Sequence, residues 1–358
     1  MDSEMSTTRR QYLLGAGSLA ATSTTGCLQA LGFSSRSAWA DPPLVEDPPT
    51  GVYVPAITEG MLESDRHVGP ELEVSLMYSY PHRFWTAAGT KMSKTPVQPS
   101  DDVHLMISMW HRDTGQSVPI DAGVRLEIRQ EDTLVTDEVA YPMLSQQMGF
   151  HYGANYSLNR EGTYHVTVHL GSLSLPRSGE FDGILESPTT VPVTLEFDRQ
   201  TLADIEITER DDAGEPGAVE PMSMDGVPVG RAPSPERLPG NFLTTAHSAD
   251  AVFEIFHLVD PPFGEMPYLY ASVHTPYNHI LVPMMGLEYS IETTNGQTIE
   301  GTLERRLDST LGYHYGGSIP ALESGGLLRI HPTIPPQVAR HDGYETAFRQ
   351  MTPIETSI

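Results

Sequence analysis

Apolar and polar residues alternate over short stretches of this chain, and this period of two constrains the fold more than any other feature. In segment 103–110 one face carries four apolar side chains: Val103, Leu105, Ile107 and Met109. The same period recurs in segments 124–128, 164–170, 191–197 and 287–291, and no stretch after the first 26 residues shows a sustained helical stripe. Short strands separated by Gly, Pro, Asn and Asp turns predict an all-β fold of antiparallel sandwiches.

One motif occurs twice, at nearly the same distance from a Val-Pro pair. His151 lies in Gly-Phe-His-Tyr-Gly, 33 residues after Val118, and His314 lies in Gly-Tyr-His-Tyr-Gly, 32 residues after Val282. A chance match of this kind is improbable, so the sequence predicts two tandem domains that are related by internal duplication.

Changes in composition mark the expected domain boundaries. We expect a signal peptide over residues 1–26, a Pro- and acid-rich tether over 27–51 and a first β-sandwich domain over 52–210. A Pro-, Gly- and acid-rich linker is expected over 211–240, followed by a second β-sandwich domain over 241–358.

The N-terminus resembles a twin-arginine export signal. Arg9 and Arg10 precede an apolar stretch from Tyr12 to about Ala21. This stretch is too short to span a bilayer, which takes roughly 20 apolar residues, but it suits the core of a signal peptide. The chain is therefore expected to be exported.

Two processing sites compete after this signal. Cys27, the only cysteine, ends a Thr-Thr-Gly-Cys sequence that resembles a lipobox, whose cysteine becomes lipidated. Lipidation would anchor the protein to the outer face of the cytoplasmic membrane, at the cell surface. The alternative is cleavage after Ala38-Trp39-Ala40, which would leave a secreted protein. In either case a single thiol excludes an internal disulfide.

The charge balance excludes one class of partner. Asp and Glu number 47 against 21 Lys and Arg, which gives a net charge of -26, and only two of the bases are lysines. Such a chain has no basic surface to neutralise phosphates, so no nucleic-acid partner is expected. An acidic, lysine-poor composition is typical of proteins that stay soluble in high salt, and an extracellular haloarchaeal protein is our expectation.

The residue types favour metal binding over catalysis. The chain carries 14 His and 15 Met, and His104 and Met106 share one face of a predicted strand. Imidazole with thioether suits copper, whereas imidazole with carboxylate suits iron or zinc. No Gly-x-Ser-x-Gly elbow and no phosphate-binding glycine loop is present, so we expect no enzyme. A repeated His-Tyr-Gly also has a purely structural explanation as a turn in which the His bonds its own loop.

Several segments together resemble a known family. They are His104-Leu105-Met106, Pro142-Met143, the stretch Gly149-Phe150-His151-Tyr152-Gly153-Ala154-Asn155, and Arg340-His341-Asp342-Gly343-Tyr344-Glu345-Thr346. They are similar to motifs of the periplasmic iron-transport protein family, small Ig-like β-sandwich proteins that bind copper and iron beside high-affinity iron permeases. The resemblance implies two Ig-like sandwiches, here as a divergent tandem copy in a haloarchaeal-type lipoprotein.

The resemblance also implies a ligand set that is divided between the copies. The first copy offers His104, Met106, Met143 and His151 as metal ligands, with Met106 where the family has Glu. The second copy offers His314 and His341, and Tyr268-Leu269-Tyr270 replaces its His-Leu-Glu. Because family members pair as dimers, the two copies could pack as a pseudo-dimer. We expect one composite site on His151 and His104, and a degenerate site on His314 and His341.

These observations predict an extracytoplasmic metal-binding lipoprotein. It would capture a copper or iron ion for uptake by a membrane iron permease. The main alternative is a structural or adhesive cell-surface protein that kept the sandwich and lost the metal. A carbohydrate-binding sandwich is a third possibility, which would need an exposed aromatic platform.

Overall fold

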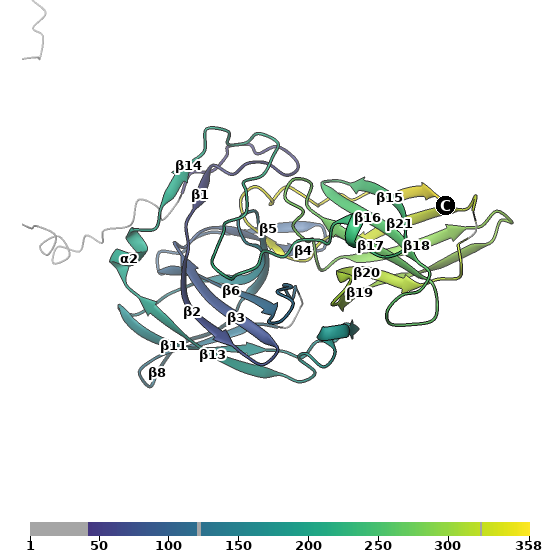
Figure 1. The fold of residues 1–358 in the computed structure, drawn as a ribbon. Coiled ribbons are helices and arrows are strands. Elements are labelled where there is room, and N and C mark those ends of the chain that lie inside the picture. Colours follow the sequence, from purple (N-terminus) through teal and green to yellow (C-terminus); the bar gives the residue numbers. More distant parts are fainter. Residues whose placement is uncertain (1–41, 120–122, 323) are drawn as a thin grey trace, which may run out of the picture. The chain divides into compact units, whose positions relative to one another are not determined.

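Strands and loops make up nearly all of the computed structural model, which describes residues 42–119, 123–322 and 324–358 (Figure 1). The described helical segments are short: η1 (Gly179–Phe181), α2 (Arg199–Ala203) and η2 (Pro235–Arg237). The predicted all-β class is confirmed. Among the described residues, no helix has the length and apolar character needed to cross a membrane. The predicted export and lipidation residues Arg9, Arg10 and Cys27, and the cleavage site at Ala40, lie outside the described residues.

The first half of the chain forms two facing sheets and a small two-stranded one. The larger has the order β2 (Leu62–Val68), β3 (Leu72–Ser79), β6 (Val103–His111), β10 (Gly149–Tyr156), β9 (Tyr141–Ser145), β22 (Ala339–Arg340), β4 (Phe84–Ala88), β5 (Lys91–Thr95). The second has the order β13 (Thr189–Phe197), β11 (Gly162–Leu170), β7 (Arg125–Gln130), β8 (Thr133–Val139). Away from both, β1 (Ile57–Glu59) pairs with β14 (Ile207–Glu209).

Side chains of β6 point alternately to the two faces of its sheet, and this alternation positions its polar residues. Leu105 and Ile107 point into the main core, where they join residues of the facing sheet such as Leu126 and Val166. The opposite face of β6 is buried as well, since all nine residues of the strand are buried. That second face carries His104 and Met106, and it is the face on which the candidate site is built.

The second half forms one curled sheet. Its order is β15 (Asn241–Ser248), β16 (Ala251–Leu258), β17 (Tyr268–His274), β20 (Gly312–Ser318), β19 (Thr298–Asp308), β18 (Gly286–Glu292), β21 (Leu327–Ile334), β23 (Ile354–Ser357). A short strand from the first half, β12 (Arg177–Ser178), also pairs with β19.

The two halves pair corresponding strands in the same register. In the first half His104 lies opposite Asn155, and Met106 lies opposite Gly153. When His151 is matched with His314, the equivalent pairs are Tyr268 with Ser318 and Tyr270 with Gly316, and these are the pairs that the structure contains. The adjacent strand agrees, because Met143 lies opposite His151 and Arg306 lies opposite His314. This identity of register is compatible with the expected duplication.

Each half contributes a short strand to the sheet of the other half. β22, which follows β21 in the chain, pairs in parallel with β9 of the first half and in antiparallel fashion with β4. In return β12 pairs in parallel with β19 of the second half. Arg340 lies opposite Leu144, and Arg177 lies opposite Leu307, the residue equivalent to Leu144. Figure 1 shows yellow chain from the C-terminal part running beside β4 and β5.

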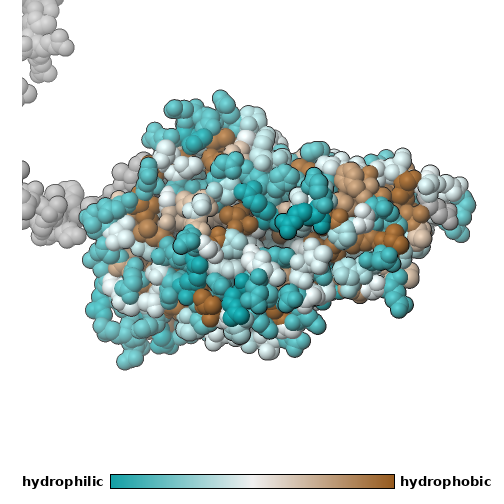
Figure 2. Space-filling view, in the orientation of Figure 1, coloured by the Kyte–Doolittle hydropathy of each residue, from teal (hydrophilic) through white to brown (hydrophobic). Residues whose placement is uncertain are grey.

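The surface is mostly hydrophilic on the face in Figure 2, with brown apolar residues in separate patches. This is the distribution expected of a strongly acidic chain, because charged side chains are rarely fully buried.

Candidate metal centre

The central histidine of the first repeated motif is aimed by the glycine that precedes it. Gly149 adopts a φ of 69°, which a residue with a side chain rarely takes. This bend lets Nδ1 of His151 lie 3.2 Å from the carbonyl oxygen of Gly149. Because a carbonyl can only accept, the proton sits on Nδ1, and Nε2 keeps its lone pair.

His104 is held in the same state by a different partner. Its Nδ1 lies 2.7 Å from Oδ1 of Asn155, the residue opposite it on β10. Asn155 is oriented in turn by its Nδ2, which donates to the carbonyl of His82 at 2.9 Å. Nε2 of His104 is buried and has no hydrogen-bond partner. A buried nitrogen with a free lone pair is costly unless something binds it.

The glycine of the first His-Tyr-Gly motif leaves room for this nitrogen. A Cβ on Gly153 would stand 2.8 Å from Nε2 of His104 and 3.2 Å from Sδ of Met143. Both atoms therefore meet at one small concavity above β10, where a side chain on residue 153 would displace them.

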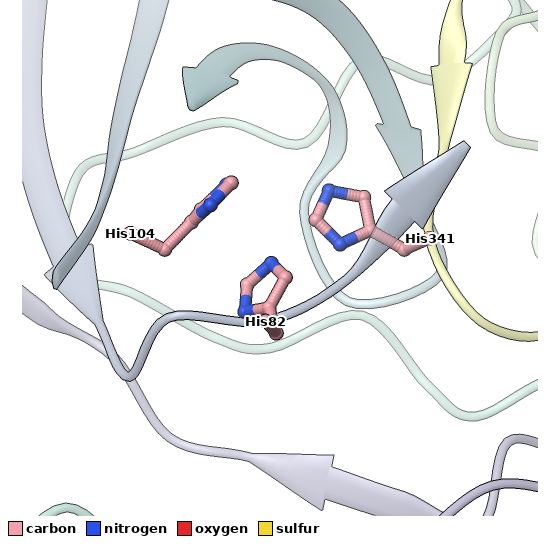
Figure 3. A group of neighbouring side chains, drawn as sticks. All are labelled: His82, His104 and His341. Carbon is pink, nitrogen blue, oxygen red and sulfur yellow. The ribbon is translucent and has the colours of Figure 1, made fainter. Parts of the chain in front are cut away.

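His82 and His341 complete the cluster, and Figure 3 shows these two side chains together with His104. The candidate ligand atoms of His82, His104 and His341 all lie within 4.8 Å of one another. Nε2 of His341 also lies 3.2 Å from Nε2 of His151. The rings of His82 and His104 stack at 4.0 Å between centroids. Four imidazoles and one thioether thus converge.

The loops that carry His82 and His341 are tied together by the residues that follow them. Nη2 of Arg83 lies 3.2 Å from Oδ2 of Asp342. The carboxylate of Glu345 accepts hydrogen bonds from the Tyr53 hydroxyl and from the backbone N–H of Gly343. These contacts fix the turn after β22, so the protein itself sets the position of His341.

Burial keeps His104, His151 and His341 uncharged near neutral pH. It lowers the pKa of His151 to about 4, and the hydrogen bond to Gly149 only partly opposes this shift. Burial also lowers the pKa values of His104 and His341 well below the usual range, and repulsion from neighbouring histidines adds to the effect. Neutral imidazole is the form that binds metal ions, so these rings can act as ligands near neutral pH.

A single ion fits this arrangement. Two nitrogens bound at about 2.05 Å to one tetrahedral ion stand about 3.3 Å apart, close to the 3.2 Å between Nε2 of His151 and Nε2 of His341. Nε2 of His104 is buried without a partner, and the Nε2 atoms of His151 and His341 are close enough to share one proton or to bind one ion. Several imidazoles with one thioether form a donor set that copper prefers.

The structure brings four of the six sequence-predicted ligands together and places the other two elsewhere. His104, Met143, His151 and His341 are brought together. Met106 lines the adjacent cavity and packs against Met77 and Met148. The expected pairing of His341 with His314 is corrected: β22 joins the first half's sheet, so His341 contacts His151, while the His314 ring lies against tyrosines.

The site around His314 is filled by the protein itself. Nδ1 of His314 is bound by the carbonyl of Gly312 at 2.9 Å, as in the first copy. However, the Tyr268 hydroxyl lies 3.3 Å from Nε2 and occupies the lone pair. A Cβ on Gly316 would stand 2.3 Å from the Tyr268 ring, so the concavity holds an aromatic side chain. Arg306, equivalent to Met143, places a cation there, which disfavours a metal ion.

Sequence reasoning missed His82. It lies in the loop between β3 and β4, outside every motif that resembles the family. No spacing rule links it to His341, from which it is separated by more than two hundred residues. Two further histidines, His165 and His169, lie on β11 in the facing sheet, with side chains turned away from the core.

The chain is similar to known proteins over part of its length. Residues 236–357 match a family described as a domain of unknown function, DUF7350. No curated protein matches the chain. Among solved structures, FetP of uropathogenic Escherichia coli strain F11 is 19% identical, with a TM-score of 0.31, over 38% of this chain and 95% of that one. Copper-reconstituted P19 of Campylobacter jejuni is 17% identical, with a TM-score of 0.30, over 38% of this chain and 96% of that one.

Proposed function

We propose that this protein binds a copper ion at a single centre formed by His82, His104, His151 and His341. Met143 supplies a thioether to the same centre. The observation that carries the proposal is the convergence of four imidazoles, two of them with Nε2 atoms 3.2 Å apart, at a place where the buried Nε2 of His104 has no hydrogen-bond partner. Iron is the second metal to test, since imidazole also suits that ion.

The role we propose is capture and delivery, without substrate turnover. The protein would hold the ion outside the cytoplasm and pass it to a membrane iron permease. Twin-arginine export through Arg9 and Arg10 would let the site fold before it meets scarce metal, and a lipid on Cys27 would keep it beside the membrane. The acidic composition suits a haloarchaeal, salt-rich exterior.

The test is elemental analysis of the full chain purified from its native host, alongside His151→Ala and His341→Ala variants. We expect one equivalent of copper in the wild type and little in either variant. His314→Ala is the matched control, because it removes the equivalent histidine of the second motif. Wild-type protein that holds no stoichiometric metal, before or after incubation with copper or iron, would contradict the proposal and favour the structural or adhesive alternative.

A further inference from the structure

A group of methionines lies next to the histidine centre. Met77, Met106 and Met148 are buried in contact with one another, and Met61 and Met224 pack against them from partly exposed positions. Met77 and Met106 are direct partners across β3 and β6, so their side chains share one face at a distance of about 5 Å between Cβ atoms. The other three residues come from loops.

Packing alone does not explain this group. Methionine often fills irregular gaps in a core, but a gap filler is surrounded by other apolar side chains. Here every buried member of the cluster is a methionine, whereas the main core mixes Val, Leu, Ile, Phe and Tyr. Three of these methionines, Met61, Met106 and Met148, also line a cavity of about 80 Å³.

The same cavity reaches the histidine centre. His82, His341 and Asp342 line it together with the three methionines. Met148 also lines a smaller pocket of about 10 Å³, with Met222 and Met224 from the segment that joins the two halves. Thioethers therefore extend from this segment, where Met222 and Met224 are partly exposed, to the edge of the imidazole cluster.

The chemistry of this path differs from that of the centre. Thioethers are soft, uncharged ligands that select Cu(I) over Zn(II), Fe(II) and the alkaline-earth ions, whereas imidazole also accepts harder divalent ions. They do not titrate, so their affinity for Cu(I) does not depend on pH through protonation of the ligands.

We propose that Met61, Met106 and Met148 form a second metal site, a thioether site for Cu(I). Met77 and the pair Met222 and Met224 flank it. The Cu(I) site stands on the methionine cluster itself; only the further role, as the entry from which the ion moves to the histidines, rests on the proposed function.

The experiment is an anaerobic titration of the metal-free full chain with Cu(I), in competition with a chromophoric Cu(I) chelator. We expect the wild type to take up one equivalent more than a Met106→Leu/Met148→Leu variant. Leu has nearly the volume of Met, so the variant should keep its packing. Met266→Leu is the matched control, because Met266 is 53% exposed and outside the cluster.

A second measurement locates the ion without relying on stoichiometry. Ag(I) mimics Cu(I) and is not oxidised in air, and methionine methyl groups labelled with ¹³C report on it by NMR. We expect the methyl signals of Met61, Met106 and Met148 to shift upon addition of Ag(I), while that of Met266 stays in place. Equal Cu(I) uptake by the wild type and the double-Leu variant, or Ag(I) shifts confined to other methionines, would overturn the proposal.

A further variant distinguishes failure of the thioether site from failure of the histidine centre. A His104→Gln/His341→Gln variant removes two ligands of the histidine centre and leaves the methionines intact. If the thioether site exists, this variant still takes up Cu(I) and shows the Ag(I) shifts, even if the wild type fails to hold copper at its histidines. If the histidine centre alone binds copper, this variant takes up none, and the thioether site is excluded.

Discussion

Nε2 of His151 and Nε2 of His341 lie 3.2 Å apart, although 190 residues separate them in the chain. His151 belongs to the first repeated motif, whereas His341 follows a strand that the second half inserts into the sheet of the first. The reciprocal strand, β12, carries Ser178 at the position equivalent to His341, and this serine bonds Asp308. The exchange of strands therefore completes one cluster of four histidines and leaves the equivalent place in the second half without its distant histidine.

Gly153→Ala should weaken metal binding more than folding. The added Cβ would stand 2.8 Å from Nε2 of His104 and 3.2 Å from Sδ of Met143, so both ligands must move. We expect copper affinity to fall at least about tenfold, as it does when ligand positions are disturbed. Isothermal titration with Cu(II) measures the change.

The control for this substitution is Gly264→Ala, where an added Cβ meets nothing within 4 Å. Gly316→Ala is an informative contrast, because its Cβ would clash with the Tyr268 ring. It should lower the melting temperature and leave copper affinity unchanged. Normal copper binding by Gly153→Ala would show that His104 or Met143 is not a ligand.

Asn155→Ala should lower copper affinity about 10- to 100-fold, the usual effect of losing a partner that orients a metal-binding histidine. The variant removes the acceptor that holds Nδ1 of His104 at 2.7 Å and the donor that holds the carbonyl of His82. Competition with a chelator of known affinity measures the loss. Ser318→Ala, at the exposed equivalent position of the second half, should bind copper as the wild type does.

Tyr53→Phe should destabilise the fold and loosen the turn that carries His341. The Tyr53 hydroxyl donates to Glu345, a carboxylate that is only 5% exposed. Leaving a buried acceptor without this partner costs about 1–3 kcal/mol of unfolding free energy, measurable by chemical denaturation of metal-free protein. Tyr277→Phe is the control, because Tyr277 is 50% exposed. A stability equal to that of the wild type would argue that Glu345 is not held by Tyr53.

His314 should make the protein less stable in mild acid. Burial lowers its pKa from 6.5 to about 4. The unfolded chain therefore binds a proton at a pH where the folded chain does not, and unfolding is favoured as the pH falls. The free energy of unfolding is unaffected by protonation of this histidine above pH 6.5. It falls progressively below that pH, and the loss reaches about 3 kcal/mol by pH 4.

A His314→Gln variant removes this term and leaves the histidine centre intact. The difference in unfolding free energy between wild type and variant should therefore shift in favour of the variant as the pH falls from 7 to 4. His247→Gln, at an exposed position, serves as the control. A pH-independent difference for His314→Gln would contradict the predicted burial of a neutral imidazole.

The all-β class could be predicted because it depends on short-range sequence patterns and not on contacts between distant residues. A period of two places alternate side chains on opposite faces of a strand, so the alternation of Val103, Leu105 and Ile107 already indicated a sheet with an apolar face. The repeated motif likewise identified equivalent positions, and the structure pairs these positions in the same register in both halves. The pattern of apolar residues along a strand sets its register, so similar sequences favour the same pairing. The predicted domain boundaries and individual ligands remain predictions for experiment.

Other features depended on contacts that no local pattern encodes. The opposite face of β6 is also buried, because His104 packs there against His82 and His341, and Met106 packs against Met77 and Met148. His82 belongs to no motif, and His341 belongs to the first half's site only because its strand crosses over. Spacing along a chain cannot report such long-range pairing.

The sequence by itself determined the strands, the repeated His-Tyr-Gly turns and the supply of imidazole and thioether groups, since these are properties of residue type and short-range spacing. Only the tertiary structure decided which of those groups meet. A metal site requires ligand atoms within a few ångströms of one point. The first half's own sheet brings positions 82, 104 and 151 together, and His341 joins them because β22 of the second half pairs with β9. In the second half, Tyr268 and Arg306 lie beside His314 at the positions equivalent to His104 and Met143, and they fill the second site.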